Sequence, residues 1–160
     1  MDDLEFRDLM AIVPSPVTVI TTVEDGTPAG TTVSAFTSLS LDPRLVLVSL
    51  DNRSDLLRQI RHTRRFGVNL LAEGQGDLAM RFARSRADRF AETSWALDSG
   101  LPRLGDTAAW IVCELGYELP AGDHTILAGA VHDADRSGRP ALVYSDRAFG
   151  TNSALAATPV

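Results

Sequence analysis

Residues 31–43 read TTVSAFTSLSLDP, and this stretch decides how the rest of the chain is interpreted. Threonine, valine and phenylalanine favour β-strands, so the stretch predicts a strand, although serine is a poor strand former. Alternation places Thr32 and Ser34, and past a bend Ser38 and Ser40, on one face of that strand. Such small hydroxyl side chains leave the backbone open to close approach by a ligand, whereas hydroxyls that simply face water are the structural alternative.

The flanking sequence predicts further strands joined by short turns. Residues 17–23 alternate β-branched side chains, and an Asp-Gly pair at 25–26 predicts a tight hairpin turn into a strand at 29–36. Residues 45–50 are continuously apolar, which predicts a strand covered on both faces. The remaining predicted strands are residues 66–71, 110–118, 125–131 and 140–144.

Three stretches predict short helices. Residues 4–13 carry apolar side chains at helical spacing, which predicts a short helix whose one apolar face is formed by Phe6, Leu9, Met10 and Val13. Ser54 is a predicted N-cap for the second helix, and Gly76 begins the third. Residues 85–107 show little periodicity, so we expect a long loop with some helical turns there.

These elements predict a mainly β protein with short helices. Most strands follow one another without the helical crossover that parallel pairing demands, so the sheet is expected to be mostly antiparallel. The simplest arrangement is a small closed or split β-barrel with helices at its edges, because closure removes exposed strand edges. We expect a single domain over residues 1–150 and a C-terminal tail over residues 151–160.

The composition of the 160 residues is ordinary for a globular protein, with 44% hydrophobic and 22% charged residues. The net charge of −6 argues against nucleic acid or an anionic membrane surface as a partner. No apolar run approaches the ~20 residues of a membrane helix, and the acidic first residues are unlike a secretory signal. We therefore expect a cytoplasmic protein whose single cysteine, Cys113, is a buried core thiol.

Gly122, Asp123 and His124 form a second informative motif. The glycine permits an unusual backbone turn, and the neighbouring carboxylate can orient the imidazole. A lone histidine is more often structural than functional, so this local context is what makes His124 a candidate. His62 and His132 lack that context, and no histidine or cysteine spacing is typical of a metal site.

Basic residues are concentrated at 80–90, where MRFARSRADRF holds four arginines. An arginine fork suits a phosphate or pyrophosphate group, whereas a solvated helix face is the structural alternative. The chain contains no lysine, and no glycine-rich motif follows a strand. Rossmann and P-loop nucleotide sites are therefore not expected.

Together these segments resemble the short-chain flavin reductases of the FMN-binding split-barrel type, which supply reduced flavin to two-component monooxygenases. The resemblance runs from about residue 6 to residue 149 and rests on VTVITT, TTVSAFTSLSLDP, FGVNLL and the Gly-Asp-His motif. MRFARSRADRF is similar to reductases of actinomycete polyketide pathways. Two positions depart from the family pattern: Pro16, where glycine is usual, and Arg44, where a second proline is usual.

The resemblance implies which residues bind the two ligands. His124 is implied to meet the nicotinamide of NADH or NADPH and is the one implied catalytic residue. The implied contacts to the flavin, FAD or FMN, are Thr31, Thr32, Val33, Ser34, Ser38, Leu39, Ser40, Ser49, Asp51, Asn52, Ser54, Phe82, Ala83, Arg84, Gly122 and Asp123.

The implied activity is hydride transfer from NADH or NADPH to FAD or FMN, with reduced flavin then supplied to a partner monooxygenase. The resemblance also implies a homodimer and, as the fold, an antiparallel split β-barrel of Greek-key type. A non-catalytic flavin-binding or flavin-storing protein is one alternative, and a dimeric interaction module is another. A pyridoxal-phosphate-type oxidase of the same barrel type is a third, although its phosphate sites rely on lysine, which this chain lacks.

Overall fold

The computed structural model describes residues 1–84 and 89–152 and contains three short helices among many strands. The helices are α1 (Asp3–Ala11), α2 (Asp55–Thr63) and α3 (Gly76–Ala83). The strands are β1 (Ser15–Pro16), β2 (Thr18–Glu24), β3 (Thr27–Val33), β4 (Phe36–Leu41), β5 (Arg44–Asp51), β6 (Arg65–Leu70), β7 (Trp95–Asp98), β8 (Leu101–Leu104), β9 (Ala109–Ala121), β10 (His124–Arg136), β11 (Leu142–Ser145) and β12 (Ala148–Thr151).

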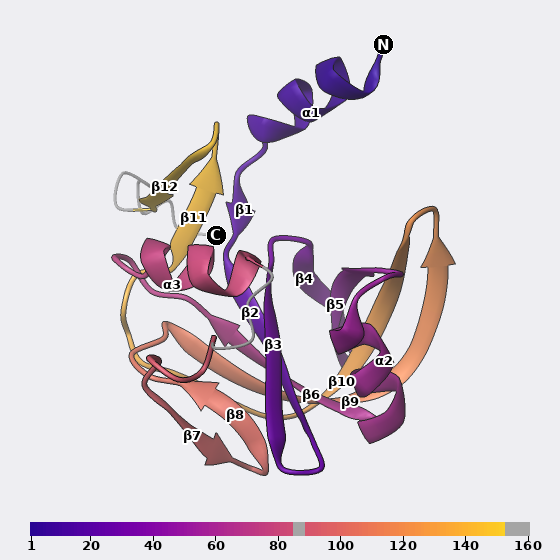
Figure 1. The fold of residues 1–160 in the computed structure, drawn as a ribbon, viewed down its shortest axis with the longest axis vertical. Helices are drawn as coiled ribbons and strands as arrows, with labels where there is room; N and C mark the ends of the chain where they lie inside the picture. The colour runs from indigo at the N-terminus through magenta and orange to yellow at the C-terminus, as the bar shows by residue number, and fades with distance from the viewer. Residues whose placement is uncertain (85–88, 153–160) are drawn as a thin grey trace.

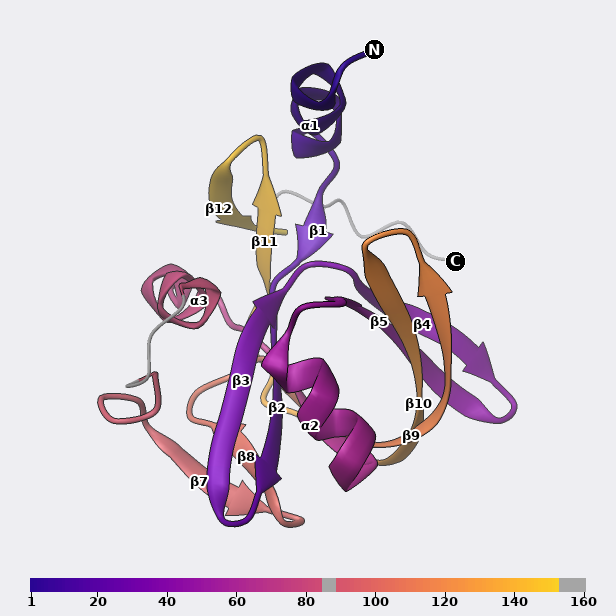
Figure 2. The same cartoon turned by 45° about the vertical axis from the view of Figure 1, so that its right-hand side comes forward.

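Seven strands form one strongly curved sheet in the order β3-β2-β6-β9-β10-β5-β4. Every strand pairing within the described residues is antiparallel, as the scarcity of helical crossovers predicted. The curvature brings β3 back into contact with β5, although these strands are not hydrogen-bonded neighbours. Figure 2 shows α2 lying in the opening between them. The predicted split barrel is therefore confirmed, and its split runs between β3 and β5.

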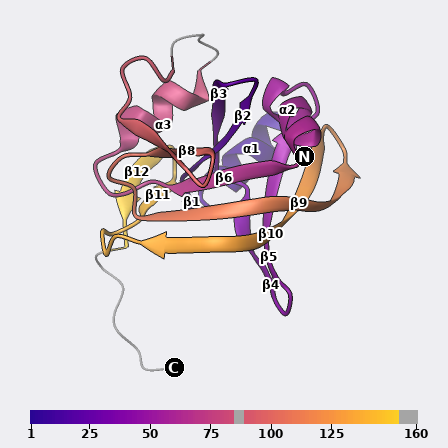
Figure 3. The same cartoon turned by 90° about the horizontal axis from the view of Figure 1, so that it is seen from below.

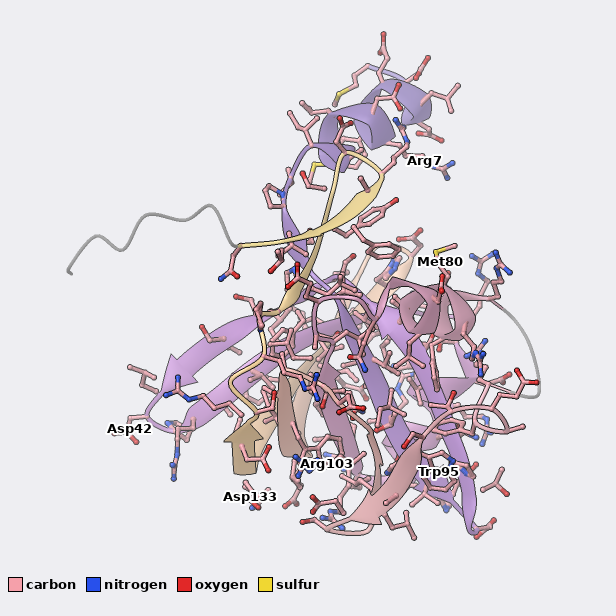
Figure 4. All side chains as sticks on the ribbon, turned by 90° about the vertical axis from the view of Figure 1, so that its left-hand side faces the viewer. Arg7, Asp42, Met80, Trp95, Arg103 and Asp133 are labelled. Carbon is pink, nitrogen blue, oxygen red and sulfur yellow. The ribbon has the colours of Figure 1, made fainter. Side chains whose placement is uncertain are left out.

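Two hairpins border this split, β2–β3 and β4–β5. Asp25 and Gly26 both have positive φ (51° and 77°) and join β2 to β3, as the sequence predicted. The predicted strand at 29–36 is in fact broken at Ser34, after which the chain crosses over into β4. Figure 3 shows the β4–β5 hairpin projecting beyond the long strands β9 and β10. In Figure 4, Asp42 lies at the tip of that hairpin.

The core fills the barrel from the side of α2. The inner face of this helix consists of Leu56, Leu57 and Ile60, all buried as predicted, and it packs with Phe66 and Leu127 in one apolar cluster. A second cluster lies under α3 and contains Phe82 and residues of β8 and β11. Because α2 follows directly after β5, this core packing also fixes the loop at residues 52–54 beside the split.

Residues 89–107 do not form the long loop that the sequence predicted. They contain the antiparallel hairpin β7–β8, while residues 85–88 lie outside the described residues. The hairpin is held by tertiary contacts: the Pro102 carbonyl accepts hydrogen bonds from Thr21 Oγ1 (2.7 Å) and Asn69 Nδ2 (3.3 Å). Local sequence carries no record of such long-range bonds, which explains the error.

The first helix forms as predicted, whereas one burial prediction, for residues 45–50, is wrong. Helix α1 forms with an intact capping box at Asp2 and Glu5, but none of its residues is buried, and Figure 1 shows it standing away from the barrel. Strand β5 alternates buried and half-buried residues instead of being covered on both faces, because its second face borders the split. Thr151 of the predicted tail belongs to β12, and residues 153–160 lie outside the described residues.

Cys113 lies in the interior of β9, as predicted. Its side chain is buried, and burial raises the pKa of the thiol to about 12. The thiol therefore stays protonated at physiological pH, which makes it unreactive. Among the described helices, none has the length and apolar character needed to cross a membrane.

Candidate active site at the split of the barrel

A groove of about 310 Å³ follows the split between β3 and β5. Thr31, Thr32, Val33, Ser34 and Ala35 form one wall of this groove. The opposite wall is formed by Ser49, Leu50, Asp51, Ser54 and His124, which come from β5, the loop after it and the start of β10. Segments about 90 residues apart in sequence thus meet here, and eight of the residues that the sequence predicted lie in this one groove.

The groove offers hydrogen-bonding groups that have no partner among the described residues. The hydroxyls of Ser34, Ser49 and Ser54 make no hydrogen bond to any part of the chain that the structure describes. Strand β3 lies at the end of the sheet order, so its outer backbone groups face the split instead of another strand. Free hydroxyls and edge-strand amides suit a planar ligand with several polar atoms along one edge.

The hydroxyls of Thr31 and Thr32 have a different use. Thr31 Oγ1 donates to the Phe82 carbonyl (3.3 Å), and Thr32 Oγ1 donates to the Ala79 carbonyl (2.6 Å). These bonds attach α3 to the back of β3. The two threonines therefore line the groove chiefly through their backbone, while their side chains fix the strand against the helix.

Asp51 and Arg53 stiffen the loop between β5 and α2. Arg53 donates to the Asp51 carboxylate from its backbone nitrogen (2.7 Å), from Nε (3.1 Å) and from its terminal nitrogen (2.7 Å). The Arg53 side-chain hydrogen bond, followed by the backbone one, lowers the pKa of Asp51 well below its ordinary value. Asp51 therefore stays ionised and bound to Arg53, which holds Ser54 beside the groove.

Asn52 joins this loop to the Gly-Asp-His turn. Its backbone nitrogen donates to the Asp123 carbonyl (2.9 Å), and its side-chain nitrogen donates to the Gly122 carbonyl (3.2 Å). Thr125 Oγ1 donates to Asn52 Oδ1 (2.7 Å). The Asn52 side chain therefore helps to hold the turn that carries His124, and its contact with flavin stays a prediction.

His124 is positioned as the motif suggested. Gly122 adopts φ +62° at the first position of the two-residue turn between β9 and β10, a conformation that favours glycine. Asp123 Oδ1 lies 2.8 Å from His124 Nδ1, and this hydrogen bond lowers the pKa of Asp123. His124 pairs with Asp51 across the sheet and lines the groove, so its other ring nitrogen is left for a ligand. His132, by contrast, is exposed and lies 3.0 Å from Glu114 Oε2.

The remaining predicted contacts lie outside this groove in the isolated chain. Ser38 and Leu39 are exposed on β4, and Ser40 is half-buried there. The Phe82 ring is fully buried in the core, edge-on to Phe90 with centroids 5.0 Å apart. Ala83 and Arg84 follow at the exposed end of α3, the helix on which Figure 4 shows Met80 pointing away from the barrel. Gly122 and Asp123 shape the turn without lining the groove.

Sequence reasoning missed Ala35 and Leu50 in the groove and a whole second cavity beside it. That cavity, of about 550 Å³, shares Thr31 and Ser54 with the groove and also contains Gln59 and Arg89. Arg89 belongs to the arginine-rich segment noted in the sequence. Gln59 gave only a weak signal, a polar residue between the buried positions of α2. Within the described residues, no three histidine, cysteine or acidic side chains gather as a metal site would require.

Comparison with known proteins agrees with this geometry. A family model described as "Flavin reductase like domain" matches residues 10–153. The chain belongs to this family. The reductase component of a 4-nitrophenol 4-monooxygenase/4-nitrocatechol 2-monooxygenase from Rhodococcus opacus is 37% identical over 151 residues, covering 94% of this chain and 81% of the relative. The flavin reductase (NADPH) of Lentzea aerocolonigenes is 38% identical over 149 residues, covering 91% and 87%.

Other flavin reductases among the curated relatives are longer. The chain spans about half their length: 49% of a probable flavin reductase from Rhizobium meliloti, at 38% identity over 94% of this chain. It spans 48% of the reductase component of a trigonelline monooxygenase from Acinetobacter baylyi, at 39% identity over 92% of this chain.

Solved structures of flavin reductases share the whole fold. The NADH:FAD oxidoreductase SgcE6 of Streptomyces globisporus, solved with NAD and FAD fragments, superposes with a TM-score of 0.90 at 31% identity, covering 95% of this chain and 93% of that one. The flavin reductase PheA2 gives a TM-score of 0.88 at 34% identity, covering 96% and 99%.

The groove residues fit a flavin. An isoalloxazine ring is flat and carries acceptors and a donor along its pyrimidine edge, which the free hydroxyls and the outer backbone of β3 can match. Small side chains at Ser34, Ala35 and Ser49 leave room for a ring to approach the backbone. His124 at the mouth remains available for a second ligand.

Proposed function

We propose that this protein is a flavin reductase that transfers a hydride from NADH or NADPH to FAD or FMN. One observation carries the proposal: the groove at the split of the barrel is lined by His124 and by three serine hydroxyls that have no hydrogen-bond partner within the described residues. The bound flavin supplies the hydride-accepting ring, and the protein supplies position and electrostatics. Family membership supports the same activity.

The residues of the groove act mainly by orientation. Holding two rings face to face in a near-attack geometry removes much of the entropic barrier, with reacting atoms about 3–3.5 Å apart. The backbone of Thr32 to Ser34 lies where N–H groups would stabilise negative charge that develops on the reduced ring. Rigid attachment of β3 to α3 through the Thr31 and Thr32 hydroxyls keeps these donors in place.

His124 is proposed to orient the nicotinamide. Asp123 holds Nδ1 and Asn52 holds the turn, so Nε2 is the ring nitrogen left for the ligand. We assign His124 no acid or base role, because hydride transfer itself requires neither. The family relationship further supports a diffusing flavin, released after reduction to a partner monooxygenase, as the names of several relatives imply for those proteins.

The test is NADH and NADPH oxidation measured with riboflavin, FMN and FAD side by side. We expect oxidation that requires added flavin and saturates with flavin concentration. Flavin binding without any oxidation of either nicotinamide would contradict the proposal and indicate a flavin-storing protein instead. Failure to bind any of the three flavins would overturn the assignment of the groove.

We also propose that the protein is a homodimer. Helix α1 is capped and regular, yet Leu4, Phe6 and Leu9 are all more than half exposed. Leu41 on the β4–β5 hairpin is 89% exposed. Exposed apolar residues clustered on one helix are typical of surfaces that another chain covers. Sedimentation should give a dimer mass, and the double substitution Phe6→Asp and Leu9→Asp should shift it to a monomer; a monomeric wild-type protein would contradict this.

A further inference from the structure

The turn that carries His124 is not held by the hydrophobic core. Strand β9 is exposed at every residue from Gly116 to Ala121, and Gly122 and Asp123 are exposed as well. Figure 1 shows this end of the β9–β10 hairpin projecting at the right-hand side of the molecule. The position of the His124 ring therefore depends on strand pairing and on polar contacts between the hairpin end and the rest of the protein.

One buried side chain connects this hairpin end to two other segments. Thr125 directly follows His124, and neighbouring residues of a strand face opposite sides of the sheet. Thr125 is 1% exposed and lines neither the groove nor the second cavity beside it. Its hydroxyl donates to Asn52 Oδ1 (2.7 Å) and accepts from a terminal nitrogen of Arg61 (3.5 Å).

Arg61 makes this connection from the last turn of α2. Its Nε donates to the Glu118 carboxylate on β9 (2.8 Å), so the same guanidinium contacts both strands of the hairpin. The helix itself is anchored in the core by Leu57 and Ile60, which are fully buried. An isolated ion pair between partly exposed groups contributes little to stability, so the contact is better explained by the position that it gives to the hairpin.

Asn52 continues the connection to the turn. Its side-chain nitrogen donates to the Gly122 carbonyl (3.2 Å), and its backbone nitrogen donates to the Asp123 carbonyl (2.9 Å). The Thr125 hydroxyl selects one orientation of the Asn52 amide, because it donates to Oδ1 and so leaves Nδ2 facing Gly122. Asp123 in turn holds Nδ1 of His124. A continuous set of hydrogen bonds thus runs from α2 to the His124 ring.

We propose that Thr125 is a positioning residue for hydride transfer. Together with Arg61, it holds the Asn52 amide and the turn so that His124 meets the nicotinamide in one orientation. The inference rests on the proposed function for the role of His124. Because Thr125 and Arg61 both lie outside the groove, they act on the reaction only through His124, and flavin binding does not depend on them.

The first test is a double-mutant cycle on kcat/KM for NADH. Thr125→Val removes the hydroxyl and keeps nearly the same shape. We expect it to lower kcat/KM about three- to tenfold, the value of one hydrogen bond, and to leave the flavin dissociation constant unchanged. Thr125→Ser keeps the hydroxyl and should restore most of the activity. In a His124→Ala background, Thr125→Val should have no further effect, because residues that act as one unit are not additive.

The second test observes His124 without any activity. The chain has three histidines, so the ring signals of His124 in an NMR spectrum are identified by their absence in His124→Ala. These signals should shift in Thr125→Val and return towards their wild-type positions in Thr125→Ser. They should also shift in Arg61→Met, which tests the connection from its other end if Thr125→Val does not fold.

Two substitutions serve as matched controls. Thr21→Val removes an equally buried hydroxyl, one that donates to the Pro102 carbonyl (2.7 Å) and does not line the groove. It should lower stability without changing kcat/KM or the His124 signals. Arg58→Met removes an arginine from the same helix as Arg61, but one that pairs with Glu24 on β2 and not with the hairpin. It should change neither property.

Three results would overturn the inference. In the first, Thr125→Val lowers kcat/KM equally in the wild-type and His124→Ala backgrounds. In the second, the His124 signals stay unchanged in Thr125→Val, or in Arg61→Met where Thr125→Val does not fold. In the third, Thr21→Val lowers kcat/KM as much as Thr125→Val does. If the protein oxidises no NADH at all, the NMR comparison still decides whether Thr125 positions His124, so the two proposals fail separately.

Discussion

Strand β2 and the groove at the split are both rich in hydroxyl side chains, yet these hydroxyls serve different purposes. On β2, Thr18, Thr21 and Thr22 are completely buried, and each donates to a backbone carbonyl, at 2.7, 2.7 and 2.8 Å. Along the split, the hydroxyls of Ser34 and Ser49 make no hydrogen bond within the described residues. Hydroxyl content alone therefore says little, and the presence or absence of an internal partner separates a structural hydroxyl from one available to a ligand.

We therefore expect substitutions among the buried polar groups beside β2 to lower the stability of the fold and to leave ligand binding in the groove unchanged. Asn69 is the strongest case: its amide contacts Val19, Thr21 and Pro102, and Leu104 donates to its Oδ1 at 2.7 Å. We expect Asn69→Ala to lower the free energy of unfolding by about 2–4 kcal/mol, because several buried groups lose their partners. Denaturant unfolding measures this change, and exposed Asn152→Ala is the control. A loss below about 0.5 kcal/mol would contradict the assignment.

The buried thiol of Cys113 should also make the free energy of unfolding depend on pH. Its folded pKa of about 12 exceeds the ordinary value near 9, so the unfolded chain releases the thiol proton first. Stability from this group is complete below pH 9 and falls by up to about 1.4 kcal/mol per pH unit as the pH rises towards 12. The absence of lysine leaves few other groups that titrate in this range. The fall measured by denaturation from pH 9 to 11 should be smaller in Cys113→Ala; equal slopes would refute burial of the thiol.

Much of the fold follows from local patterns, whereas the site depends on contacts that local patterns do not contain. The Asp25-Gly26 turn, the buried face of α2 and the turn at Gly122 were all predictable from spacing and turn chemistry. The β7–β8 hairpin was not, because Pro102 weakens the strand signal and its carbonyl is held by distant Thr21 and Asn69. The apolar face of α1 indicated a helix correctly but could not reveal that nothing in the described part of the chain covers it.

The residues of the groove also divide into those that the sequence indicated and those that only long-range contacts bring together. Family resemblance placed Ser34, Ser49 and His124 in one site, and the register of β10 on β5 explains why they meet. It also assigned Asn52 to the ligand, and the structure shows its amide holding the Gly122 turn. Gln59 and Arg89 come together only through the packing of α2 against β3, which no spacing along the chain could indicate.

His124 and His132 allow a direct comparison between a histidine that lines the groove and one that does not. His124 lines the groove, whereas His132 contacts only Glu114 at the surface. We expect His124→Ala to lower kcat/KM for NADH about tenfold, since a positioning contact to the nicotinamide is lost. His132→Ala should leave the kinetics unchanged. Steady-state kinetics decide the matter, and equal effects of the two substitutions would remove His124 from the site.

The smallest expected effect comes from a single free hydroxyl. Ser49→Ala should weaken flavin binding about three- to tenfold, the value of one hydrogen bond, and change the free energy of unfolding by less than about 0.5 kcal/mol. Thr22→Val on β2 should do the reverse, lowering stability by about 1 kcal/mol without affecting flavin affinity. Fluorescence titration and denaturant unfolding of both variants test the pair. The distinction between the buried hydroxyls of β2 and the free hydroxyls of the groove would fail if both substitutions acted on the same property.

A crystal structure with bound FAD tests the central claim most directly. We predict that the isoalloxazine ring lies between β3 and β5, with polar atoms within hydrogen-bond distance of the backbone at residues 32–34 and of Ser49, and with His124 at its open face. A ring bound elsewhere on the protein, or a groove filled by the protein's own side chains in the presence of saturating FAD, would contradict the account.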